Sequence, residues 1–145
     1  MRISVASDSL DGVASNLIFE IEKRGHTVIA HGALTDERAD WAWCCSRAAE
    51  DVVSGAADQA IVCCWTGTGA SIAANKIAGI RAALCPDAAT AAGARQWNDA
   101  NVLAISLRLI SAPLLEEILD AWFAASASLD ENDQANIAYL SEIEN

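Results

Sequence analysis

Two kinds of segment alternate along the chain, and they differ in how apolar and polar residues are spaced. Short apolar runs rich in Val and Ile, such as residues 61–64, have the length of buried strands. Between these runs, apolar residues recur at helical spacing, as Val13, Leu17 and Ile21 do. The predicted strands cover residues 3–7, 27–30, 61–64, 81–85 and 102–105. The predicted helices cover residues 11–24, 40–53, 71–77, 87–97, 113–124 and 130–145.

Residues that favour helix ends support this division. Asp11 is a predicted N-cap, Gly25 a predicted residue just beyond a helix end, and Pro113 opens the helix after the fifth strand. Strand and helix alternate without a repeat or linker, which predicts a single domain over residues 1–145. The expected fold class is α/β: a three-layer α/β/α sandwich with a five-stranded, mostly parallel, doubly wound (Rossmann-like) sheet. The pattern leaves the strand order open.

The last predicted helix differs from the others because it is acidic and has a narrow apolar face. That face consists of Ile137, Leu140 and Ile143. Such a terminal helix can pack on its own domain or on a second subunit.

Composition narrows the class of protein. Of the 145 residues, 53% are hydrophobic and 20% are charged, as in a globular chain rather than a disordered one. No apolar run approaches the roughly 18 residues that span a bilayer, and the N-terminus lacks the apolar region of a signal peptide. We therefore expect a cytoplasmic protein without a membrane partner. The net charge of −11 also argues against nucleic acid as a partner, because nucleic acid requires a basic surface.

The five cysteines and two histidines form no metal-ligand set. Two of the cysteine pairs are adjacent in the chain, no C-x-x-C occurs, and both histidines follow the first helix. We expect no metal and no cofactor, and we expect most of these thiols to be small buried hydrophobic groups. Cys64 is the exception that the following motif singles out.

The candidate chemistry lies where the third strand meets a glycine-rich turn. The segment IVCCWTGTGASIAANK, residues 61–76, places Cys64 at a strand end, before Gly67 and Gly69 and a helix start. Ligands of open α/β sheets bind at this edge, and the N–H groups of a helix start favour an anion or a developing oxyanion. The alternative is a glycine-rich turn that merely contains buried cysteines.

Longer segments resemble the ribose-5-phosphate isomerase B family, which includes the galactose-6-phosphate isomerase subunits. The matching segments are residues 7–8, 54–58, 64–69, 71–76, 79–85 and 98–103. The resemblance is nearly gapless from Asp40 to Trp122, and the run from Ser71 to Cys85 is its most specific part.

This resemblance implies an aldose–ketose isomerase that works through a cis-enediolate, as a homodimer or larger homo-oligomer with active sites at the subunit interface. It implies that Cys64 is the base that moves a proton between C1 and C2, that Thr66 assists it, and that Asp8 handles hydroxyl protons. The N–H groups around Gly67 to Gly69 would hold the enediolate oxygen, and Asn98 would contact sugar hydroxyls. The candidate substrate-binding residues are Ser9, Trp41, Trp65, Gly67, Thr68, Gly69, Ser71, Trp97, Asn98 and Arg108.

The chain departs from the family pattern at the substrate end. Ser9 and Trp97 stand where the family has histidines, the second of which is thought to open the sugar ring. Trp41 replaces a tyrosine, and Trp65 replaces a glycine. The tail from residue 129 to 136 contains none of the arginines that bind the substrate phosphate in relatives, which leaves Arg108 as the leading anion contact.

We therefore expect an isomerase with a changed substrate: a short or acyclic sugar phosphate, or an unphosphorylated sugar stacked on tryptophan. A catalytically inactive sugar-binding or regulatory paralogue is the alternative. A nucleotide-binding domain is a weaker option, since Ile72 occupies the place of the third glycine in G-x-G-x-x-G. Trp41 could also serve core or interface packing rather than a pocket wall.

Overall fold

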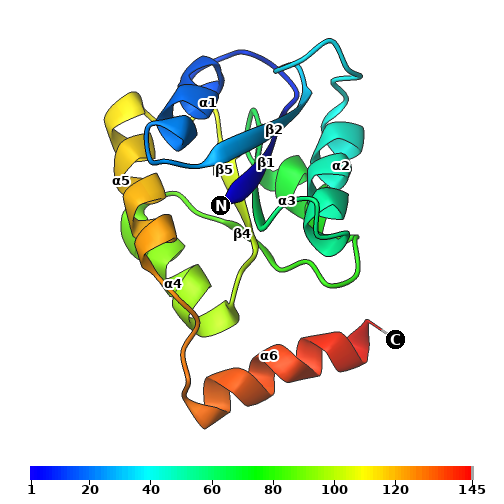
Figure 1. The fold of residues 1–145 in the computed structure, drawn as a ribbon, viewed down its shortest axis with the longest axis vertical. Coiled ribbons are helices and arrows are strands. Elements are labelled where there is room, and N and C mark those ends of the chain that lie inside the picture. The colour runs from blue at the N-terminus through cyan, green and yellow to red at the C-terminus, as the bar shows by residue number, and fades with distance from the viewer. Residues whose placement is uncertain (145) are drawn as a thin grey trace.

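A five-stranded parallel sheet between two layers of helices forms the body of the computed structural model, which describes residues 1–144 (Figure 1). The strands are β1 Arg2–Ser7, β2 Thr27–Gly32, β3 Gln59–Cys64, β4 Ala82–Leu84 and β5 Val102–Ser106. The helices are α1 Ala14–Glu22, α2 Trp41–Val53, α3 Thr68–Asn75, α4 Ala88–Asn98, α5 Ala112–Ala124 and α6 Glu131–Ile143. The predicted α/β sandwich is confirmed.

The strand order is β2-β1-β3-β5-β4, and every strand pair within the described residues is parallel. The order reverses beside β1 and β3, because β2 lies on one side of this pair and β5 and β4 lie on the other. In such sheets a crevice forms at the carboxyl ends of the strands where the order reverses. Asp8 follows β1 and Cys64 ends β3, so both stand at this point.

Two cores of different character cover the two faces of the sheet. One face packs large aliphatic side chains against α1, α4 and α5, with the fully buried Trp122 donating its indole N–H to Gln59 at 2.8 Å. The other face packs mainly alanine and cysteine against α2 and α3. Small side chains bring these two helices close to the strands, so that the start of α3 lies directly beside the end of β3.

Several predicted boundaries were wrong by a few residues. The first helix begins at Ala14 with Val13 as its N-cap, and the carbonyl of Asp11 accepts the N–H of Ala14 in the preceding turn. α3 begins at Thr68 and not at Ser71, because the backbone turns within one residue, at Gly67. β2 extends to Gly32, so residues 31 and 32 do not belong to the following loop.

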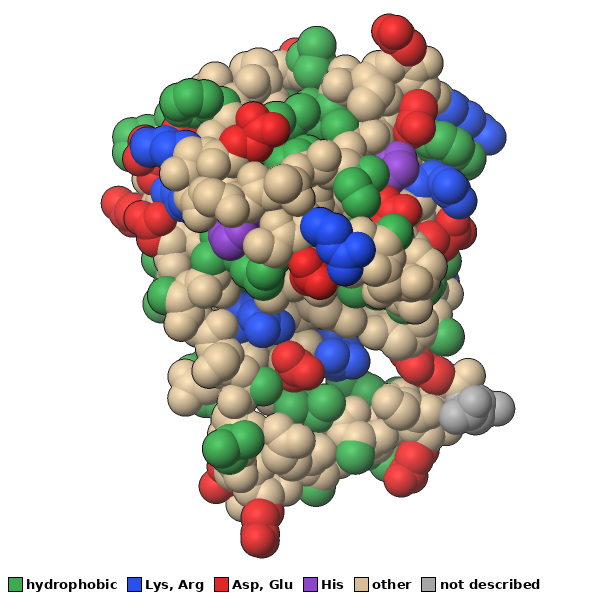
Figure 2. Space-filling view, in the orientation of Figure 1, with side chains coloured by type: hydrophobic (Ala, Val, Ile, Leu, Met, Phe, Trp, Pro, Cys, Tyr) green, Lys and Arg blue, Asp and Glu red, His purple; other side chains and the backbone are tan. Residues whose placement is uncertain are grey.

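α6 is separated from the rest of the protein. None of its residues is buried, and it follows the segment 125–130, which has no regular structure (Figure 1). Figure 2 shows it as a separate lobe below the main body. Its end is held where the carboxylate of Glu144 accepts the N–H of Gly79 at 2.9 and 3.0 Å. No helix within residues 1–144 is long and apolar enough to cross a bilayer.

Candidate functional site

A pocket of about 350 Å³ opens at the carboxyl edge of the sheet, where the strand order reverses. Its lining comes from the connections that follow three strands, β1, β2 and β3. The lining residues are Asp8, Trp41, Cys64, Trp65, Thr66, Thr68 and Gly69. All seven are among the predicted site residues.

The turn between β3 and α3 places Cys64 in this pocket. Gly67 has a φ of +75°, and a Cβ there would lie 2.9 Å from the backbone of Ile105 and Ser106. Only glycine accepts both the left-handed conformation and this close approach. The carbonyl of Cys64 accepts the N–H of Gly67 at 3.2 Å and that of Leu107 at 3.0 Å, which fixes the turn to the end of β5.

The thiol of Cys64 lies at the start of α3. Its Sγ accepts the N–H of Ala70, in the first turn of α3, at 3.4 Å, and the residue is 5% exposed. The sulfur of Cys64 therefore accepts a backbone hydrogen bond at a helix start and also lines the pocket.

Cys63 and Cys85 lie in surroundings that favour the neutral thiol. Burial raises the pKa of Cys85 to about 12, and it raises the pKa of Cys63 as well. Cys63 is adjacent to Cys64 in the chain, but its side chain belongs to the core on the opposite face of the sheet. The expectation that most of these thiols are buried hydrophobic groups agrees with these positions.

Two further groups face Cys64 across the pocket. Partial burial raises the pKa of Asp8, and the neighbouring Asp11 raises it further. The hydroxyls of Thr66 and Thr68 lie 2.8 Å apart and share one hydrogen bond, so the pair can donate one further proton toward the pocket. The site thus combines a thiol, a carboxyl group and hydroxyls within one small volume.

Trp41 forms a wall of the pocket, and Gly69 is the reason it fits. A Cβ at Gly69 would lie 3.0–3.3 Å from atoms of the Trp41 ring, so the indole rests directly on the first turn of α3. Trp65 also lines the pocket and is 55% exposed.

Six predicted residues do not line this pocket: Ser9, Gly67, Ser71, Trp97, Asn98 and Arg108. Gly67 shapes the turn that carries Cys64 without lining the pocket itself. The hydroxyl of Ser9 accepts the N–H of Asp11 at 3.2 Å and so caps the turn after β1. Ser71 lies one helical turn into α3. Trp97 folds over Gly93 in its own helix, and Trp97 and Asn98 line a second pocket of about 440 Å³ beside α4.

Arg108 also lies outside the lining, yet its backbone is close to the site. Its N–H donates to the carbonyl of Trp65 at 2.9 Å, and its exposed side chain forms no ion pair within residues 1–144. It is therefore a cation available at the edge of the pocket.

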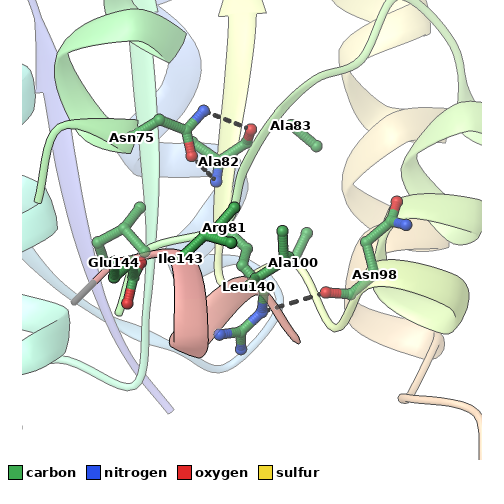
Figure 3. A pocket seen from close by; sticks show the side chains of 10 residues that line it. Asn75, Arg81, Ala82, Ala83, Asn98, Ala100, Leu140, Ile143 and Glu144 are labelled. Carbon is green, nitrogen blue, oxygen red and sulfur yellow. Dashed lines mark hydrogen bonds between the residues drawn. The ribbon is translucent and has the colours of Figure 1, made fainter. Parts of the chain in front are cut away.

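A further cavity, of about 460 Å³, lies elsewhere. It separates α6 from the amino end of β4, and Asn98, Leu140 and Ile143 are among its lining residues (Figure 3). Its polar groups are mostly paired within the chain: the amide of Asn75 donates to and accepts from the backbone of Ala82, at 2.9 and 2.8 Å, and the guanidinium of Arg81 donates to the carbonyl of Asp99 at 2.8 Å.

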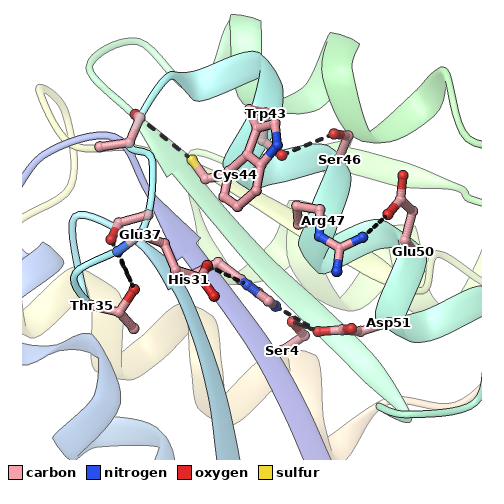
Figure 4. Close-up of polar contacts among 12 residues, drawn as sticks. Ser4, His31, Thr35, Glu37, Trp43, Cys44, Ser46, Arg47, Glu50 and Asp51 are labelled. Atoms are coloured by element: carbon pink, nitrogen blue, oxygen red, sulfur yellow. Dashed lines mark hydrogen bonds and ion pairs between the residues drawn. The ribbon is translucent and has the colours of Figure 1, made fainter.

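One polar cluster was not anticipated from the sequence. The ring of His31 lies between the carboxylates of Glu37 and Asp51, at 2.9 and 2.7 Å, and Ser4 donates to Asp51 at 2.7 Å (Figure 4). The three partners are 6 to 27 positions away from His31 in the sequence, at spacings that carry no known motif. No group of three or more His, Cys, Asp or Glu side chains in residues 1–144 is placed to hold a metal ion.

Comparison with known proteins identifies the family. The sequence profile of the Ribose/Galactose Isomerase family matches residues 3–140. Ribose-5-phosphate isomerase B of Escherichia coli is 42% identical over 109 residues, which cover 75% of this chain and 73% of that protein. A D-erythrulose-4-phosphate isomerase of Pectobacterium atrosepticum is 34% identical, with 86% and 84% of the two chains covered.

A solved structure agrees with the sequence relatives. Ribose-5-phosphate isomerase B of Clostridium thermocellum superposes with a TM-score of 0.89 and 36% identity, covering 99% of this chain and 97% of that one. The predicted resemblance is confirmed along the chain, and with it the class of enzyme, an aldose–ketose isomerase. The chain belongs to the Ribose/Galactose Isomerase family.

Proposed function

We propose that this enzyme interconverts an aldose and a ketose, with Cys64 as the base that moves a proton between C1 and C2. The observation that carries the proposal is the Sγ of Cys64, held at the start of α3 by the N–H of Ala70 and open to the pocket. A positioned base contributes about 10²- to 10⁴-fold to such a reaction.

The reaction needs two proton transfers, one at carbon by Cys64 and one between the oxygens by Asp8. The thiolate removes the proton from the carbon next to the carbonyl, and the electron pair moves to the carbonyl oxygen, forming a cis-enediolate. Asp8, whose pKa is raised by burial, moves the hydroxyl proton between the two oxygens. The Cys64 thiol then returns its proton to the other carbon.

The enediolate oxygen carries negative charge, and the start of α3 is positioned to stabilise it. The backbone N–H groups of Thr68 and Gly69 lie in the first turn of the helix, where they have no partner within the helix, whereas the N–H of Gly67 is donated to the carbonyl of Cys64. Losing one such donor costs enzymes about 10²- to 10³-fold in rate. Thr66, paired with Thr68, assists the base from the same turn.

We propose a short, acyclic sugar phosphate as the substrate, ahead of an unphosphorylated sugar. A tetrose 4-phosphate cannot close a five-membered ring, because its O4 carries the phosphate, so it needs no residue that opens a ring. Trp97 in place of the family histidine is compatible with such a substrate. The name of the Pectobacterium relative points in the same direction. Arg108 is the candidate phosphate contact, and Trp41 and Trp65, which stand in place of a tyrosine and a glycine, supply aromatic walls.

We further propose that the active site is completed by a second copy of the chain, as a homodimer or larger assembly. Trp97 and Asn98 line pockets beside α4, and α6 buries no residue in a single chain. An interface that covers α4 and α6 would explain both observations. Cytoplasmic location and turnover without a metal remain predictions from the sequence.

The test is isomerase activity in matched cysteine variants. Cys64→Ala and Cys64→Ser should each lower kcat by at least about 10²-fold on the substrate found from a panel of tetroses, pentoses and their phosphates. Cys63→Ala is the control, because it removes an adjacent thiol that faces the other core. A Cys64→Ser variant with unchanged kcat would refute the assignment of the base.

The alternative function is a sugar-binding or regulatory paralogue without catalysis. Exchange of deuterium from solvent into the carbon next to the carbonyl separates the two functions, because only a base in the site produces it. A thermal shift with ligand but no exchange, across the full panel, would favour the alternative.

A further inference from the structure

The cluster around His31 connects four segments of the chain. Ser4 lies on β1, His31 on β2, Asp51 in α2, and Glu37 in the loop of residues 33–40 (Figure 4). His31 is 6% exposed, although both of its ring nitrogens are within hydrogen-bond distance of a carboxylate. Buried polar groups that are paired in this way fix the relative position of the segments that carry them.

Glu37 is the point at which the second half of this loop is held. Among residues 36–40, the side chain that forms a hydrogen bond to another part of the fold is that of Glu37, which bonds to His31 on β2. Arg38 pairs with Asp40 instead, and the N–H of Glu37 bonds to the nearby Thr35 at 3.1 Å. The residues from 35 to 38 are exposed, so packing contributes little to holding them.

The end of this loop determines where Trp41 lies. Trp41 is the first residue of α2, and the N–H groups of a first turn have no partners within the helix. The N-cap, Asp40, makes no side-chain cap to α2. The core holds the body of α2 through Cys44 and Cys45, whereas its first residue, Trp41, follows the loop directly and must stay on Gly69 to form the pocket wall.

We propose that His31 is a positioning residue for substrate binding: by joining Glu37 to Asp51, it fixes loop 33–40 and thereby the Trp41 wall. This inference rests on the proposed function, since Trp41 matters only if the pocket holds the substrate. His31 touches neither the pocket lining nor Cys64. Its loss should therefore weaken substrate binding and leave proton transfer intact.

Two matched pairs of variants test this. Glu37→Gln and His31→Gln should each raise KM by about tenfold while kcat stays within about twofold, because the wall is misplaced and the base is not. The controls are Asp36→Asn in the same loop and His26→Gln in the other histidine, and both should keep the wild-type KM. A fall in kcat at unchanged KM, or a KM equal to that of the controls, would overturn the proposal.

Hydrogen exchange tests, without any substrate, whether the hydrogen bonds of His31 to Glu37 and Asp51 hold loop 33–40 in place. The amides of residues 35–42 should exchange at least about fivefold faster in Glu37→Gln than in Asp36→Asn, with unchanged exchange in β3 and α3. Equal exchange in the two variants would overturn the proposal. If the wild type turned over no sugar in the panel, the proposed function would fail. Faster exchange in Glu37→Gln would still show that His31 and Glu37 fix loop 33–40.

Discussion

Asp8 illustrates how a single residue can serve function at a cost to stability. Burial raises its pKa, which means that the folded protein disfavours the carboxylate relative to the unfolded chain. At neutral pH the group is ionised in the unfolded chain, so the raised pKa makes a negative contribution to stability there. Functional residues commonly carry such a cost.

We predict that Asp8→Asn lowers kcat without lowering Tm. At pH 7 the Tm of the variant should equal or exceed that of the wild type, because the neutral amide avoids the burial of a charge. The difference should vanish below about pH 3.5, where the carboxyl is protonated in both states of the wild type. Thermal scans at several pH values measure this, and a lower Tm for the variant at pH 7 would contradict it.

At the scale of residues, the sequence predicted which side chains take part in the chemistry, but not which of them lie close together in one chain. Cys64 was identified from a strand end and a glycine turn, Thr66 and Asp8 were assigned from the family resemblance, and the structure brings all three to one pocket. Trp97 and Asn98 were assigned to the same site, yet a single chain places them beside α4. A sequence cannot show whether two residues meet within one chain or across two.

At the scale of elements, the connection between β3 and α3 depends most on a single position. Gly67 must adopt a positive φ, and it also lies against the backbone of β5. The helix start was expected at Ser71 because the segment TGTG looked like loop. The structure begins the helix at Thr68, since one left-handed residue is enough to change direction.

We predict that Gly67→Ala is much more damaging than Gly55→Ala, although both glycines have a φ near +75° to +78°. Gly55 has nothing within 4 Å of an added Cβ, so its replacement should cost only about 1–2 kcal/mol from backbone conformation. At Gly67 the contact with β5 adds roughly 1–3 kcal/mol of overpacking. Urea denaturation of both variants measures the difference, and equal losses would show that the contact is relieved.

The fold class was predictable because strand and helix signals alternate so regularly. The strand order was not, since it depends on which loops cross which face, and the pattern of apolar residues is the same for several orders. The hydrogen bonds of His31 could not be predicted from the sequence either. Its partners come together only through the folded arrangement of β2, α2 and the loop between them.

At the scale of the whole molecule, α6 and the end of α4 are the features on which the proposed assembly of two or more chains rests. Leu140 and Ile143 line a cavity of about 460 Å³ and are 38% and 61% exposed. The family resemblance implies active sites at a subunit interface, and the positions of Trp97 and Asn98 fit this arrangement.

We predict that two inactive variants restore activity when they are mixed. Cys64→Ala and Asn98→Ala should each be impaired alone, whereas co-refolding equal amounts should regain about a quarter of wild-type activity, the fraction of intact sites in randomly paired dimers. Activity at the average of the two separate variants would mean that each site belongs to one chain. Sedimentation of the wild type supplies the size of the assembly.

The strand order of the sheet has a consequence for how the substrate of such an enzyme changes. Asp8 follows β1, Trp41 begins the helix after β2, and Cys64 ends β3. A mutation at Trp41 changes the wall of the pocket, while the backbone hydrogen bonds that hold Cys64 to the end of β5 are made by other segments. The replacement has only to fit against Gly69, on which the indole rests. This division of the pocket among segments lets one scaffold inherit a single reaction while its lineages exchange one sugar phosphate for another.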